Sequence, residues 1–123
     1  MRLISLQKGQ PAQQIGGVAF GGKIETPDTD PNPEIGNFVD AAGLMMNLDL
    51  VVCCDTSLVH LAGALGRPVF TAVPQVPDWR WLQDRDDTPW YPTMGLFRQG
   101  RGESWDAVLA RIAAAVAELA QRR

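Results

Sequence analysis

One short segment of the sequence combines residue types that can bind phosphate. Asp55, Thr56 and Ser57 follow one another, and His60 comes three positions later. The two hydroxyl groups and an imidazole N–H can all donate hydrogen bonds to phosphate oxygens. If these residues begin a helix, its free backbone N–H groups and the positive end of its dipole also favour an anion. The segment therefore predicts a phosphate site at a helix N-terminus, with His60 on the same side as Thr56.

The same residues also allow a purely structural interpretation. Asp55 and Thr56 could cap the helix, and His60 could pack on its flank. A hydrolytic triad of Ser57, His60 and Asp55 is rejected, because three residues at one helix start cannot adopt the geometry that a triad requires. From the residues alone, the phosphate site and the structural cap both stay open.

The elements around this segment predict a parallel α/β fold. Leu50–Cys54 is a continuous apolar run, which is typical of a strand covered on both faces in the middle of a parallel sheet. We expect a helix over 57–65, ended by Gly66, and then a strand over Pro68–Val73. Strands that alternate with helices imply a parallel sheet with helices on both faces. Ligands bind at the C-terminal edge of such a sheet, where the predicted phosphate site begins.

Further elements are expected on both sides of this unit. Toward the N-terminus they are a strand over 2–6, a short helix from Pro11, weak strands over 18–20 and 24–26, a loop over 27–33 and a helix from Asn37. Toward the C-terminus they are a long loop with a short helical turn over 74–93, a strand over 95–98 and a final helix capped by Ser104, with an apolar stripe that starts at Trp105. We expect one domain over residues 1–123, because this length suffices for one continuous core but not for two.

Composition and charge exclude several classes of protein. Hydrophobic residues make up 46% of the chain and charged residues 20%, which is typical of a soluble globular protein. The net charge of −3 argues against a general nucleic-acid or anionic-membrane surface. No apolar run approaches the roughly 20 residues that span a bilayer, and the N-terminus lacks the apolar stretch of a signal peptide. The expected location is therefore cytoplasmic.

No cofactor and no metal are expected. The first strand is not followed by the Gly-x-Gly-x-x-Gly pattern of a dinucleotide site. The chain has one histidine and no carboxylate–histidine spacing typical of a metal site. Cys53 and Cys54 are adjacent and cannot easily bridge each other, so we expect reduced packing residues.

Two consecutive segments carry a resemblance to a known family. Bacterial glycosyltransferases of the heptosyltransferase type have a C-terminal region that resembles LDLVVCCDTSLVHLAGALGRPVF and the VPDWRWLQDRDDTPWYPTMGLFRQ that follows it. The likeness is strongest to versions fused to tetratricopeptide repeats, and the opening ISLQKG also resembles the first strand and loop of the same half. Family members have the GT-B architecture, in which two Rossmann-like domains face a cleft. The resemblance thus implies a Rossmann-like three-layer sandwich with a mostly parallel sheet.

The resemblance also implies a role for individual residues. The C-terminal domain of the family holds the nucleotide-sugar donor, so Asp55, Thr56, Ser57 and His60 would lie around the donor diphosphate. Lys8, at the end of the first strand, would neutralise phosphate charge. Without the family a solvated loop lysine is the favoured interpretation, and with the family both interpretations stay open. No residue of this chain is assigned a catalytic role.

The loop rich in tryptophan offers candidate contacts to the base or the sugar. Trp79 and Trp81 could stack on flat or apolar ligand faces, as could Trp90, or these rings could close the core beneath the loop. We expect at least two of the three to be core. Arg80 and Arg85 could pair with a diphosphate, although three neighbouring aspartates favour a surface charge cluster. Trp79, Trp81 and Arg80 are thus candidates for base or sugar contacts.

The function that the resemblance implies is donor binding without transfer. In the family, the N-terminal domain binds the acceptor and usually supplies the catalytic base, and nothing in 123 residues can be that domain. We therefore expect a truncated gene product, an excised domain or one part of a split system, with a nucleotide-sugar as ligand and a missing GT-B domain or a tetratricopeptide-repeat protein as partner. The alternative is a non-catalytic or degenerate module that binds nucleotides or a protein. Self-association through the exposed interdomain face would favour that alternative.

Overall fold

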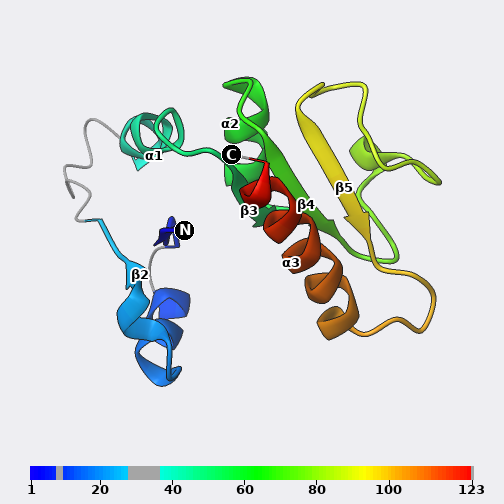
Figure 1. Cartoon of the computed structure of the whole chain (residues 1–123). Helices are drawn as coiled ribbons and strands as arrows, with labels where there is room; N and C mark the ends of the chain where they lie inside the picture. The colour runs from blue at the N-terminus through cyan, green and yellow to red at the C-terminus, as the bar shows by residue number, and fades with distance from the viewer. Residues whose placement is uncertain (8–9, 28–36, 123) are drawn as a thin grey trace. The chain divides into compact units, whose positions relative to one another are not determined.

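The computed structural model describes residues 1–7, 10–27 and 37–122 (Figure 1). The described residues form two compact units, Met1–Ala41 and Ala42–Arg123. Each unit has its own parallel sheet. The expectation of one domain over the whole chain stays a prediction.

The first unit is built from short elements. Strand β1 (Leu3–Ile4) pairs in parallel with β2 (Ile24–Glu25). The two 3-10 helices η1 (Gln10–Gly17) and η2 (Gly21–Lys23) lie between these strands in the sequence. A pair of two-residue strands has few ladder hydrogen bonds, so this unit has little regular structure to stabilise it.

Three predicted elements of the first unit are confirmed: the strand over 2–6, the helix from Pro11 and the strand over 24–26. Each of the two strands is only two residues long. The predicted strand over 18–20 is wrong. The backbone N–H of Gly21 donates to the carbonyl oxygen of Val18 (3.0 Å) and closes a turn there. Gly21 is required at this turn, because an added Cβ would lie 2.0 Å from the carbonyl oxygen of Ile15. The predicted loop over 27–33 lies outside the described residues except for Pro27.

The second unit is a Rossmann-like α/β arrangement, as predicted. Strands β3 (Val51–Cys54), β4 (Val69–Val73) and β5 (Met94–Arg98) form a parallel sheet in that order. The helices around it are α2 (Ser57–Ala64) between β3 and β4, and α3 (Trp105–Gln121) after β5 (Figure 1). The 3-10 turn η3 (Trp79–Trp81) lies in the loop before β5. Helix α1 (Asn37–Met45) precedes β3 in the sequence and spans the boundary between the two units.

The centre of this sheet is β4 and not β3. Every residue of β4 is buried or half-buried, and β4 pairs with a strand on each side. Within the described part of the chain, β3 pairs with β4 alone, and its Val52 is 50% exposed while Val51 is buried. The expectation of a middle strand covered on both faces is therefore wrong for Leu50–Cys54. Two apolar strands stand next to each other in the sequence, and composition alone does not say which of them is central.

The two faces of β4 are covered by different parts of the chain. Ala72 packs against Val108 and Ile112 of α3, and Phe70 lies beside them. Because side chains alternate along a strand, Thr71 and its neighbours at 69 and 73 point to the opposite face, where they are also buried. The sheet is thus covered on both sides, which is the arrangement that the alternation of strands and helices predicts.

Helix α3 begins as the sequence predicts. The Ser104 hydroxyl accepts a hydrogen bond from the backbone N–H of Ala107 (3.2 Å). The predicted apolar stripe is only partly buried, since Val108 and Ile112 are covered but Trp105 and Leu109 are exposed. Among the described residues, no helix is both long enough and apolar enough to cross a membrane.

Candidate functional site

The turn from β3 into α2 leaves the start of the helix open. Thr56 is the N-cap residue in extended conformation, with φ −135° and ψ 175°, and no side-chain hydrogen bond caps the helix. The Thr56 hydroxyl instead lies 3.4 Å from the Sγ of Cys53. The structural-cap interpretation of Asp55 and Thr56 is thus not what the structure shows. The first backbone N–H groups of α2 keep their capacity to bind an external acceptor.

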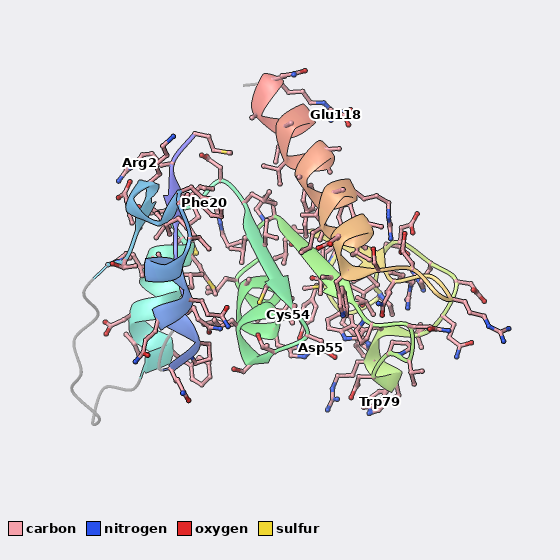
Figure 2. The ribbon with its side chains drawn as sticks, turned by 90° about the horizontal axis from the view of Figure 1, so that it is seen from below. Arg2, Phe20, Cys54, Asp55, Trp79 and Glu118 are labelled. Carbon is pink, nitrogen blue, oxygen red and sulfur yellow. The ribbon has the colours of Figure 1, made fainter. Side chains whose placement is uncertain are left out.

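Three candidate residues line this turn. Asp55, Thr56 and Ser57 are exposed, and Figure 2 shows Asp55 just beyond the end of β3. Within the described residues, the Ser57 hydroxyl has no hydrogen-bond partner. The predicted hydroxyl donors and helix N-terminus therefore meet at the C-terminal edge of the sheet.

His60 lies one turn into α2 and is held by aromatic neighbours. Its Nδ1 lies 2.9 Å from the hydroxyl of Tyr91, and its Nε2 lies 3.9 Å from Oδ1 of Asp55. The imidazole stacks on the ring of Trp81, with centroids 5.3 Å apart and planes 10° apart. Its side chain is still 34% exposed. The nitrogen that faces Asp55 is therefore the one available at the helix start.

Gly63 explains how Tyr91 comes so close to α2. A Cβ at position 63 would lie 2.5 Å from Cγ of the Tyr91 ring, with two further ring atoms within 2.8 Å. Gly63 is buried and lies three residues after His60, on the same face of the helix. The missing side chain leaves the space in which the tyrosine ring packs.

The loop that carries Trp81 is fixed to the sheet by one arginine. The guanidinium of Arg98, at the end of β5, donates to the carbonyl oxygens of Arg85 (2.7 Å), Leu82 (3.2 Å) and Trp81. Leu82 has a φ of 55° and a ψ of −152°, a positive-φ conformation that is rare for any residue other than glycine. Three carbonyls of one loop thus share one donor group, and this bonding holds the unusual backbone in place.

The three tryptophans of the loop are not equivalent. Trp81 is fully buried, whereas Trp79 is 68% exposed and Trp90 is 56% exposed. The expectation that at least two of them are core is therefore wrong. The indole N–H of Trp90 donates to the carbonyl oxygen of Arg80 (2.9 Å), so this ring is fixed at the surface. His60 stacks on one face of the Trp81 ring. The indole therefore supports the histidine and does not offer that face to a ligand.

The charged residues of the loop form local surface pairs. Arg80 donates to Oδ1 of Asp78 (2.9 Å), and its guanidinium lies 4.7 Å from the centroid of the Trp79 ring. Arg85 pairs with Asp87 (2.6 Å). The backbone N–H of Arg80 is the main reason why the pKa of Asp78 lies below its ordinary value. These pairs are the surface charge cluster that the sequence favours.

Other sequence predictions have mixed outcomes. Lys8 lies outside the described residues, so its proposed contact to phosphate stays a prediction. Cys53 is half-buried, and burial is the main cause that raises the pKa of its thiol. Cys54 is exposed, which differs from the packing role expected for it. Within the described ranges, no group of three or more side chains could hold a metal ion.

Sequence reasoning missed three residues that support His60. Tyr91 and Arg98 lie 31 and 38 positions away from the histidine in the sequence, and no spacing rule connects them to it. Gly63 did carry a signal, because a glycine inside a helix is unfavourable unless close packing requires it.

A comparison with known protein families gives a match that includes the same segment. The family model of glycosyltransferase family 9 (heptosyltransferase) matches residues 35–72, which include β3, the turn at 55–57 and α2. Protein FlbA of Caulobacter vibrioides is 31% identical over 81 residues, which are 66% of this chain and 13% of FlbA. No solved structure matches the chain. The family match supports a glycosyltransferase-related domain around the candidate site.

Proposed function

We propose that the chain binds a nucleotide-diphospho-sugar through the start of α2. The open backbone N–H groups and the hydroxyls of Thr56 and Ser57 would donate to the diphosphate oxygens. His60 would add a donor from its Nε2. Asp55 would accept from a hydroxyl of the ligand, because a carboxylate attracts hydroxyl groups and repels phosphate.

The observation that carries this proposal is the open helix start beside a fixed histidine. No side chain caps α2, and Nε2 of His60, a side chain that is 34% exposed, lies 3.9 Å from Asp55 at the same turn. Nδ1 lies at hydrogen-bond distance from the Tyr91 hydroxyl, which leaves Nε2, beside Asp55, as the nitrogen for a ligand. The family match over residues 35–72 supports the same assignment, because the matched segment includes this turn and α2.

Base and sugar contacts are proposed for Trp79 and Arg80. Trp79 is the most exposed of the loop tryptophans, and Arg80 is held beside it by Asp78. The ring and the guanidinium could together cover a flat base. The groups named here bind and orient a donor, so donor binding and not sugar transfer is the activity that we propose for the chain by itself.

The test is nucleotide binding by the parent chain and two variants. NMR titration of the labelled chain with UDP, ADP and GDP is expected to shift signals at 55–61, with one nucleotide preferred. Thr56→Ala and His60→Ala should each weaken binding by about ten- to hundredfold, since a hydrogen bond to a charged group contributes about 1.5–3 kcal/mol.

Thr93→Ala is the matched control. Thr93 is also exposed, but it precedes β5 at the opposite edge of the sheet, where its hydroxyl donates to the carbonyl oxygen of Arg67 (2.7 Å). This variant should bind like the parent. Equal affinity of the parent and both site variants would contradict the assignment of Thr56 and His60. No shift in the parent at millimolar nucleotide would contradict donor binding and favour the protein-interaction module.

A further inference from the structure

We infer that Tyr91 is a positioning residue for His60. Its hydroxyl donates to Nδ1, so the imidazole proton stays on Nε2 and faces Asp55 and the start of α2. This inference rests on the proposed function, because it explains how the histidine is prepared to donate to a phosphate oxygen. Tyr91 does not touch the ligand in this arrangement and acts through His60.

The geometry gives the two imidazole nitrogens opposite partners. Nδ1 lies 2.9 Å from the Tyr91 hydroxyl, which is a full hydrogen bond. Nε2 lies 3.9 Å from Oδ1 of Asp55, which is too long for a direct hydrogen bond but close enough for electrostatic attraction. A neutral imidazole has one donor and one acceptor nitrogen, so the partner of Nδ1 decides which role Nε2 has.

Two arguments place the proton on Nε2. A carboxylate only accepts, so an unprotonated Nε2 would turn its lone pair toward the negative charge of Asp55. With the proton on Nε2, the same pair attracts. The Tyr91 hydroxyl can then donate to the lone pair of Nδ1, and both contacts are satisfied by one tautomer.

The ring of His60 has little freedom to leave this orientation. It stacks on the buried Trp81, and the Tyr91 ring is tilted against it with centroids 5.8 Å apart and an angle of 57°. Tyr91 in turn packs directly on the backbone of Gly63. Rotation of the imidazole about its Cβ–Cγ bond would break the hydrogen bond to Tyr91 and move Nε2 away from the helix start. The arrangement resembles other sites in which a second group fixes the tautomer of a functional histidine.

The chain is well suited to a direct test, because it contains one histidine and one tyrosine. Long-range ¹H–¹⁵N NMR correlation of the nucleotide-free chain, at a pH where the imidazole is neutral, reports the tautomer of His60 without any assignment problem. The parent should show a single Nε2–H tautomer with a hydrogen-bonded Nδ1. In Tyr91→Phe, the Nδ1 signal should move to the position of an unbonded nitrogen, and the tautomer should drift toward the mixture of free histidine.

The second readout is nucleotide affinity. Tyr91→Phe keeps the ring that packs on Gly63, so it should fold like the parent and weaken binding of the preferred nucleotide about three- to tenfold. Trp105→Phe is the control, because it shortens an exposed aromatic side chain on α3, which covers the other face of the sheet. This control should leave both the tautomer and the affinity unchanged.

The outcomes separate this inference from the proposed function. An Nδ1–H tautomer in the parent, or an unchanged Nδ1 signal in Tyr91→Phe, would overturn the positioning role even if nucleotides bind. A parent chain with the expected tautomer that binds no nucleotide would contradict the proposed function but uphold the fixed imidazole. A loss of affinity in Tyr91→Phe together with the tautomer change would support both.

Discussion

At the scale of single residues, the contact between Gly63 and Tyr91 links the packing of α2 to its chemistry. The tyrosine ring occupies the volume that any other side chain at position 63 would fill. Glycine inside a helix costs about 1 kcal/mol relative to alanine, so the close approach must offset that cost. The gain is a hydroxyl placed 2.9 Å from His60.

Replacement of glycine by alanine should destabilise the chain at position 63, where the tyrosine ring is in contact, and stabilise it at position 43, where there is open space. Gly63→Ala should lower the free energy of unfolding by up to about 2 kcal/mol, because the displaced ring costs about 1–3 kcal/mol and the improved helix propensity recovers about 1 kcal/mol of it. Gly43→Ala in α1 should raise that free energy by up to about 1 kcal/mol, since an added Cβ there meets nothing within 4 Å. Urea unfolding followed by tryptophan fluorescence measures both. Stabilisation by Gly63→Ala would mean that the ring moves away at no cost.

At the scale of elements, the loop between β4 and β5 depends on hydrogen bonds more than on regular structure. Its only helical turn is η3, and the carboxylate of the N-cap residue Asp78 accepts from the backbone N–H of Arg80 (3.1 Å). The backbone N–H of Leu96 in β5 donates to the carbonyl oxygen of Asp86 (2.7 Å). Together with Arg98, these bonds fix the loop that supports His60 through Trp81.

Replacement of Arg98 by methionine tests this dependence. The variant removes the donors of three carbonyl groups, at about 1 kcal/mol each, so the free energy of unfolding should fall by about 2–4 kcal/mol. Arg98→Lys should recover only part of the loss, because an ammonium group lacks the planar fork of a guanidinium. Arg101→Met is the control at an exposed position and should change little. An Arg98→Met variant as stable as the parent would show that the loop is held by packing alone.

The helices and strands could be predicted from the sequence better than the order of the strands and the contacts between distant residues. Pro68–Val73 and Ser104 carry local signals, and the strand and the helix cap at these places are confirmed. The position of β3 at the edge of its sheet depends on strand order, which composition does not encode. The Asp55–His60 segment was recognisable because its residues are close in the sequence. The contact of His60 with Tyr91 was not, because it forms only when the loop folds back onto α2.

At the scale of the whole molecule, the two units differ in how they are stabilised. The second has a three-stranded parallel sheet with helix α3 packed on β4 (Figure 1). The first has strands of two residues and 3-10 helices, which have poorer hydrogen-bond geometry than α-helices. The segment that matches glycosyltransferase family 9 begins before α1 and ends in β4, so most of it lies in the second unit. The site that we propose thus depends on the better-stabilised part of the chain.

Amide hydrogen exchange should show this difference directly. The backbone N–H groups of β4 lie between two paired strands and under α3, so they can exchange only when the sheet opens. Those of β1 and β2 need only local opening of a two-residue ladder. Exchange followed by NMR should therefore be slower in β4 by at least about a hundredfold, which corresponds to about 2.7 kcal/mol between the two opening reactions. Similar protection in both units would mean that they open together as one cooperative structure, and the expectation of a single domain would then be supported. Fast exchange at β1 and β2 with slow exchange at β4 would instead show that the second unit, which contains Asp55 and His60, is the more stable part of the chain.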